Sequence, residues 1–222
     1  MTDLSASAHR TVLAIDLSTP RGVIAVLRGD ALLYEAQFTA ERSHNAQVFA
    51  PLGQALEAVG NGPALIAVGT GPGSYTGVRI AIAAAQGVAL SRGWPVLGWS
   101  SLTTAPDSDY PILGDARRGM YYVTHVQQHR LGPIEIIDAA TAQSRVEAQP
   151  NVPWFSFDAK VPLNLPGITL CEPDAAQLAR IVTALPEPEV ETLAAAPLEP
   201  MYLQEAFITT AKKAGKKVPG MA

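Results

Sequence analysis

The segment of residues 68–90, VGTGPGSYTGVRIAIAAAQGVAL, constrains the fold of this chain more than any other. A loop rich in glycine, residues 71–77, joins the end of an apolar run to a stretch dominated by alanine. Glycines at a strand-to-helix turn allow close backbone approach, so such a loop either receives a phosphate at the helix N-terminus or turns tightly. Gly87 within the helix costs roughly 1 kcal/mol relative to alanine. We therefore expect another element or another protein to pack closely against this helix.

The glycine loop matches none of the common nucleotide-binding fingerprints in full. It lacks the Lys-Ser/Thr ending of a P-loop, and its glycines are spaced one residue too widely for the dinucleotide-binding pattern. Ser74 does not fit a nucleophile elbow, because Thr76 stands where that motif has a glycine. We interpret Ser74 as the N-cap of the helix.

The part of the chain before residue 105 contains an antiparallel opening of three strands, followed by alternating helices and strands. Alternating or continuous apolar runs mark the strands, and apolar residues at helical spacing mark the helices. In the first helix Ser43 is a candidate cap, and Pro51 predicts a kink near the middle. We expect strands at residues 11–17, 22–27, 32–38, 64–69 and 94–98, and helices at residues 43–59 and 76–90.

This order of elements is typical of a ribonuclease H-like or actin-like (ASKHA) domain, an α/β fold with mixed sheets flanked by helices. A polar break at residues 106–109 precedes a second set of strands, so we place a domain boundary at residue 105. Residues 1–105 then form the first domain, and residues 106–222 form a smaller α/β domain with a C-terminal return segment and a basic tail. In the second domain we expect strands at residues 110–113, 121–127, 134–137, 154–157 and 168–170, and a helix at residues 174–185.

Composition limits the function classes. Apolar residues make up 48% of the chain and charged residues 16%, which is typical of a compact globular protein. The net charge of −4 disfavours nucleic-acid binding over the whole surface. The single cysteine, Cys171, excludes an internal disulfide. The N-terminus has no apolar core of a signal peptide and no run is long enough to span a bilayer, so we expect a soluble, cytoplasmic protein without membrane contact.

Polar residues at the ends of predicted strands outline one candidate anion or nucleotide site. Asp16 follows the first strand, where an actin-like ATPase places a metal-facing aspartate, and Asp115 lies in the corresponding hairpin of the second domain. The alternative for Asp16 and Ser18 is hydrogen bonding to the backbone of their own turn. Next to Asp115, arginines replace the small residues that a tightly wrapped nucleotide needs. The candidate set is Asp16, Ser18, Thr19, Gly71, Gly73, Ser74, Asp115 and Arg117.

Histidines do not outline a metal site. His125 and His129 have the four-residue spacing of a helical zinc pair, but their segment alternates like a strand, which separates them by about 13 Å. His44 lies near a helix start without a second histidine nearby. We predict no metal ligands and no catalytic residues.

The chain resembles the TsaB family, also called YeaZ, whose members take part in making threonylcarbamoyladenosine in tRNA. The matching segments are VLAIDLSTPRGVIAVL, SHNAQVFAPLGQAL, VGTGPGSYTGVRIAIAAAQGVAL, LGDARRGMYYV and LEPMYLQEAF. The resemblance implies a noncatalytic relative of the catalytic subunit TsaD, because only His44 remains of the metal-binding histidine pair of TsaD-like proteins. Two departures are Met120, where the family often has an acid, and SHNAQ in place of a histidine-threonine-glutamine pattern.

The resemblance further implies a heterodimer with TsaD, formed by the helices at residues 43–59 and 76–90. It implies TsaE as a further partner, indirect contact with tRNA, and ATP and Mg²⁺ handled by the complex rather than bound by this chain. Two alternatives remain: an actin-like ATPase or kinase that uses Asp16 and Asp115, or a scaffold that forms a homodimer in the absence of TsaD. The expected interface residues are His44, Val48, Leu52, Arg79, Ala81, Ala84, Ala85 and Val88.

Overall fold

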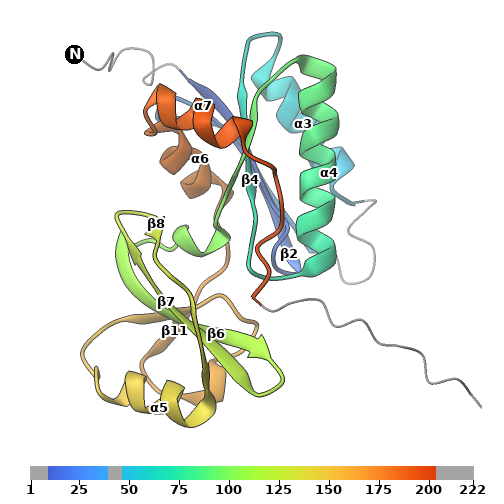
Figure 1. Ribbon diagram of the computed structural model, residues 1–222. Helices are drawn as coiled ribbons and strands as arrows, with labels where there is room; N and C mark the ends of the chain where they lie inside the picture. Colours follow the sequence, from blue (N-terminus) through green and yellow to red (C-terminus); the bar gives the residue numbers. More distant parts are fainter. Residues whose placement is uncertain (1–9, 40–46, 204–222) are drawn as a thin grey trace, which may run out of the picture.

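The computed structural model describes residues 10–39 and 47–203, which form two sheets with helices packed on them (Figure 1). The first sheet has the strand order β3-β2-β1-β4-β5. Strand β1 pairs antiparallel with β2 and parallel with β4, and β4 pairs parallel with β5. The predicted strands are confirmed, with bounds β1 Thr11–Asp16, β2 Arg21–Arg28, β3 Ala31–Thr39, β4 Leu65–Gly69 and β5 Val96–Trp99.

Helices cover both faces of this sheet. Because successive side chains of a strand point to opposite faces, Leu13 and Ile15 enter the core beneath helices α3 (Phe49–Val59) and α4 (Tyr75–Arg92). Val12 and Ala14 enter the opposite core, beneath helices α6 (Ala175–Thr183) and α7 (Glu187–Ala195). Strands β1 and β4 are therefore buried on both sides, which explains their uninterrupted apolar sequences.

The second sheet has the order β11-β10-β6-β7-β8, and β9 pairs with β7 off that path. Helix α5 (Ala139–Glu147) packs on it with Ala142 and Val146. The sequence did not predict α5, because only those two residues of a largely polar segment are buried. The predicted strands of this part are confirmed, and the bounds are β6 Asp109–Arg117, β7 Met120–Gln127, β8 Arg130–Leu131, β9 Glu135–Asp138, β10 Trp154–Ser156 and β11 Ile168–Leu170.

The structure differs from the sequence prediction in two further places. Helix α6, which lies after the predicted boundary at residue 105, returns to pack on β1 and β2, and α7 packs on β5. The boundary itself stays a prediction. Helix α3 begins at Phe49, so Pro51 lies in its first turn and not at a kink near its middle. A missing N–H is tolerated there, because the first N–H groups of a helix have no partner within it.

Side chains tie the second sheet to the first lobe, which is the first sheet with its helices. The guanidinium of Arg130 donates two hydrogen bonds to the carboxylate of Glu189 in α7, at 2.6 and 2.8 Å, and lies over the ring of Trp99. The Glu189 carboxylate raises the pKa of Arg130, and the guanidinium lowers that of Glu189. In addition, the Thr19 hydroxyl donates to Glu172 at 2.8 Å. These contacts bring the two sheets to face a common cleft.

Candidate functional sites

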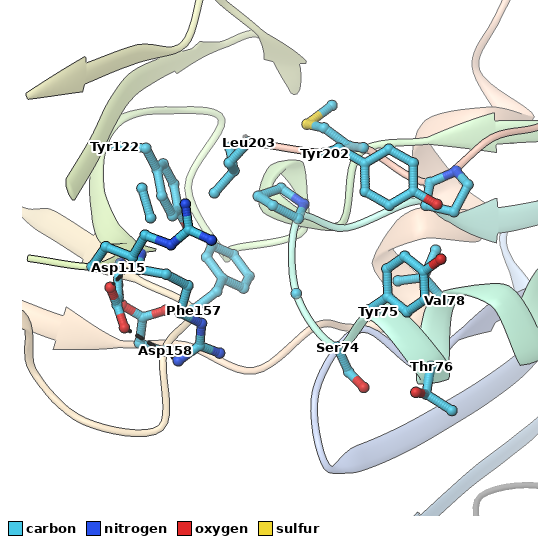
Figure 2. A pocket seen from close by; sticks show the side chains of 17 residues that line it. Ser74, Tyr75, Thr76, Val78, Asp115, Tyr122, Phe157, Asp158, Tyr202 and Leu203 are labelled. Carbon is cyan, nitrogen blue, oxygen red and sulfur yellow. Dashed lines mark hydrogen bonds and ion pairs between the residues drawn. The ribbon is translucent and has the colours of Figure 1, made fainter. Parts of the chain in front are cut away.

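A cavity of about 550 Å³ lies between the two lobes. Its walls are the glycine loop with the start of α4, the β6–β7 hairpin, and residues 200–203. Figure 2 shows Asp115 and Asp158 on the side of the second sheet, facing Ser74 and Thr76 on the side of α4. Of the predicted anion site, the structure thus brings Gly73, Ser74, Asp115 and Arg117 to one cavity.

Hydrogen bonds hold the side of the cavity that comes from the second sheet. The Asp158 carboxylate accepts from the backbone N–H of Asp115 at 2.7 Å, and Asp115 accepts from the N–H of Arg117 at 2.7 Å. Burial raises the pKa of Asp158, and the neighbouring Asp115 carboxylate raises it further. Tyr122, with a pKa raised by burial, and Phe157 complete this wall. Sequence reasoning missed Asp158, because no motif surrounds it and only its place after β10 brings it opposite Asp115.

The start of α4 forms the opposite wall. The Ser74 hydroxyl accepts a hydrogen bond from the N–H of Gly77 at 3.1 Å, which confirms Ser74 as the N-cap. The glycine loop packs directly onto the β1–β2 turn, where the N–H of Ser74 donates to the carbonyl of Ser18 at 2.6 Å. A Cβ at Gly73 would lie 2.2 Å from that carbonyl oxygen. The loop therefore occupies the space above the turn.

The structure places the rest of the predicted anion site away from the cavity. Asp16, Ser18, Thr19 and Gly71 do not line the cavity, because all four are buried behind the glycine loop or in its base. Asp16 accepts from the N–H of Ser18 at 2.8 Å, which confirms the alternative of a hydrogen bond within the turn. Gly71 donates to the Ser101 hydroxyl at 3.0 Å. Asp16 and Asp115 thus belong to different environments, one buried and one facing the cleft.

The predicted interface residues differ in how far the fold buries them. Val48, Ala81 and Ala85 have no exposed surface, since they pack in the core of the first sheet. They support α3 and α4 from within and cannot themselves touch a partner. Leu52 and Val88 are buried at the floor of a groove, Arg79 is exposed, and Ala84 is partly exposed. His44 lies outside the described residues.

An apolar groove of about 550 Å³ lies between α3 and α4 on the outer side of the first sheet. Phe49 is 62% exposed at its edge, and Leu90 on the outer side of α4 is 89% exposed. Ala83 and Gly87 leave the α4 side of the groove without bulky side chains, and a Cβ at Gly87 would meet nothing within 4 Å. The groove is lined by Phe49, Leu52, Leu56, Ile80, Ala83, Ala84, Gly87, Val88, Ser91 and Arg92.

The histidines of the second sheet make separate contacts. His125 lies in β7, as its alternating sequence predicted, and its Nε2 is 2.6 Å from Asp109 Oδ1. His129 follows β7 in a turn, with Nδ1 at 3.2 Å from the carbonyl oxygen of Thr103. Across residues 10–39 and 47–203, no group of three or more His, Cys, Asp or Glu side chains is placed to hold a metal ion. The described helices also include none long and apolar enough to cross a membrane.

Cys171 is expected to react slowly with iodoacetamide. Burial, together with the smaller effect of the carboxylates of Asp107 and Glu172, raises the pKa of its thiol to about 11. Because the thiolate is the reactive form, alkylation of the folded protein at pH 8 should be about tenfold or more slower than that of the chain unfolded in urea. Mass spectrometry measures both rates at this single thiol, and equal rates would contradict the prediction.

The comparisons with known proteins agree with this architecture. Residues 38–144 match the family described as "TsaD: tRNA N6-adenosine threonylcarbamoyltransferase". The "tRNA threonylcarbamoyladenosine biosynthesis protein TsaB" of Bacillus subtilis is 34% identical over 134 residues, which cover 56% of this chain and 58% of that protein. The TsaB protein of Haemophilus influenzae is 26% identical, over 95% of this chain and 98% of its own length. The structure of YeaZ from Pseudomonas aeruginosa superposes with a TM-score of 0.62, at 24% identity, over 87% of this chain and all of that one.

Two mixed sheets with helices packed on them and a common cleft between them make up an actin-like (ASKHA) fold. The predicted fold class is confirmed. The chain is thus similar to curated proteins named TsaB and to solved structures named YeaZ.

Proposed function

We propose that this protein is an accessory subunit in the biosynthesis of threonylcarbamoyladenosine in tRNA, without chemistry of its own. It binds a TsaD-type catalytic subunit and supports transfer of the threonylcarbamoyl group to the adenosine next to the anticodon. A TsaE-type ATPase is a further component, with ATP and Mg²⁺ handled by the complex and tRNA contacted indirectly in the cytoplasm. Since a partner shifts an equilibrium only through differential affinity, the interface binds the competent state of TsaD better than its idle state.

The observation that carries this proposal is the groove between α3 and α4. Phe49 exposes a large apolar side chain at its edge, and the small residues Ala83 and Gly87 on the α4 side let another helix approach closely. A face of this kind costs free energy while it is in water and favours a protein partner. The buried position of Asp16 argues against a joint ATPase site with Asp115, since only Asp115 lines the cleft.

Gly87→Lys tests the groove between α3 and α4, which we call the docking face, without destabilising the fold. Lysine is a better helix former than glycine, and the position has open space, so the free energy of unfolding should stay equal or rise. The ammonium would be desolvated at the centre of the apolar groove, so the affinity for the TsaD-type subunit should fall by about tenfold or more. Calorimetric titration with that subunit measures the affinity, and reconstituted tRNA modification should fall with it.

Ala195→Lys is the matched control, because it adds the same charge to the exposed surface of α7 on the opposite side of the sheet. It should bind and support modification as the unsubstituted chain does. Full binding and modification by Gly87→Lys would place the interface elsewhere. Copurification of the unsubstituted chain with its TsaD-type subunit tests the partner itself.

A further inference from the structure

Residues 197–203 form a strap that crosses from one lobe to the other. Figure 1 shows this segment descending from α7 past α4 to the second sheet. Leu198 packs against the core beneath α3 and α4, whereas Leu203 packs against the core of the second sheet. Between these two anchors, Pro200, Met201 and Tyr202 form the third wall of the interlobe cavity. The strap therefore separates this cavity from solvent on one side.

Few backbone hydrogen bonds hold the strap in place. Within residues 197–203, which all lie in the described part of the chain, no residue belongs to a helix or strand. One backbone hydrogen bond anchors them, from the N–H of Met201 to the carbonyl of Thr70 at 2.9 Å. Segments with few backbone hydrogen bonds open at a small fraction of the global free energy of unfolding. The remaining attachment comes from side chains.

The side chain of Tyr202 connects the strap to helix α4. Its ring lies 5.7 Å from that of Tyr75, the first residue of α4, with an angle of 34° between the planes (Figure 2). Arg79, one turn further along α4, donates to the Tyr75 hydroxyl at 2.6 Å and lies over its ring. Tyr202 is still 54% exposed, so a protein that lies along α4 can contact it. A second hollow, lined by Arg79, Ala83 and Tyr202, runs between the strap and the outer side of α4.

We propose that the strap closes the interlobe cavity reversibly, and that its closed position is coupled to occupancy of the outer side of α4 through Tyr75 and Tyr202. A protein bound along α4 touches Tyr202 only while the strap is closed, so binding favours closure. By thermodynamic reciprocity, closure favours binding by the same factor. This inference rests on the proposed function for the identity of the bound protein, a TsaD-type subunit.

Hydrogen exchange of the full-length protein tests the closure. In Tyr202→Ala the aromatic contact is lost, and the amide of Met201, which is hydrogen-bonded to Thr70 in the closed strap, should exchange about fivefold to tenfold faster, as expected for a contact of this kind. Amides of β4 and α4 should keep their rates. Leu33→Ala, which truncates another half-exposed apolar side chain on β3, is the control and should leave the strap unchanged. An unchanged strap rate in Tyr202→Ala would overturn the proposal.

The same measurement in the presence of the TsaD-type subunit tests the coupling. The expected result is slower exchange in both α4 and the strap, and an affinity of Tyr202→Ala reduced about threefold or more by loss of the aromatic contact. Protection of α4 with no change in the strap would overturn the coupling. If neither segment is protected, the proposed function fails, and the comparison of Tyr202→Ala with the unsubstituted chain still decides whether Tyr202 holds the strap closed.

Discussion

Gly77→Ala is expected to lower the free energy of unfolding by about 3 kcal/mol or more, as overpacking against rigid backbone does. A Cβ at this position would lie 1.9 Å from the carbonyl oxygen of Leu17. Neither side can give way easily, because Leu17 ends the buried β1 region and Gly77 donates to the Ser74 cap. Relief requires α4 to move away from the β1–β2 turn, which opens the wall of the cavity. Urea and thermal denaturation measure the loss.

Gly87→Ala in the same helix is the matched control, with the opposite expected sign. Its Cβ meets nothing within 4 Å, so only the helix propensity changes, and the free energy of unfolding should rise by about 0.5–1 kcal/mol. Gly77→Ala and Gly87→Ala together distinguish the close approach of α4 to the β1–β2 turn from the general cost of glycine in a helix. Similar effects of both substitutions would show that α4 does not press on the β1–β2 turn as described.

The strands were predictable from sequence because burial leaves a strong signal in them. The continuous apolar runs of β1 and β4 and the Gly29-Asp30 turn between β2 and β3 located the first sheet. Helices α5 and α7 were not predicted, because each buries few apolar side chains and carries a weak periodic pattern. The return of α6 to the first sheet was beyond sequence reasoning, since its amphipathic pattern shows that it packs but not against which sheet.

The predicted docking face combines side chains from both sides of α4, and the sequence alone could not separate the two sides. Ala81, Ala85 and Val88 line the inner side of α4 at the spacing i, i+4, i+7. Ala83, Gly87 and Leu90 line the outer side at the same spacing. Because both sides consist largely of small or apolar residues, the helix has little amphipathic contrast, and the sequence cannot tell which side is buried. Only the position of the sheet decides.

The residues of the candidate anion site are divided between two places for a related reason. The sequence correctly placed Asp16 and the glycine loop after β1 and β4, which are neighbouring parallel strands. Adjacent strand ends often hold a ligand between their loops. Here the backbone from Gly73 to Ser74 lies directly on Ser18, so the loops fill that space themselves. From sequence alone, a glycine loop that packs closely on another loop looks the same as one that binds a phosphate, because both need glycines at the same positions.

Asp16→Asn is expected to raise the free energy of unfolding at pH 7 by about 2 kcal/mol, the scale for replacing a buried ionisable group whose hydrogen bonding is incomplete. The carboxyl group is fully buried, and within the described residues its Oδ2 has no hydrogen-bond partner. Burial raises the pKa of Asp16, although the hydroxyls of Ser101 and Ser18 oppose the shift. Asparagine keeps the oxygen that accepts from Ser18 N–H and carries no charge.

The pH dependence gives this prediction its sign. Because the pKa of Asp16 is raised in the folded state, the unfolded chain loses this proton first as the pH rises from about 4. The stability of the unsubstituted protein therefore falls between that pH and the pKa of the folded state, and then stays level. The variant lacks this loss, so its melting temperature should exceed that of the unsubstituted protein by about 4–8 °C at pH 7 and by much less near pH 4.

Asp30→Asn, in the exposed turn between β2 and β3, is the control for the removal of a carboxylate and should shift the melting temperature by no more than about 1 °C. A lower melting temperature of Asp16→Asn at pH 7 would mean that the buried carboxylate is stabilised by groups around the turn. In that case the region behind the glycine loop would still be organised around a negative charge. The expected gain would instead mean that burying the carboxyl group of Asp16 behind the glycine loop destabilises the fold at neutral pH.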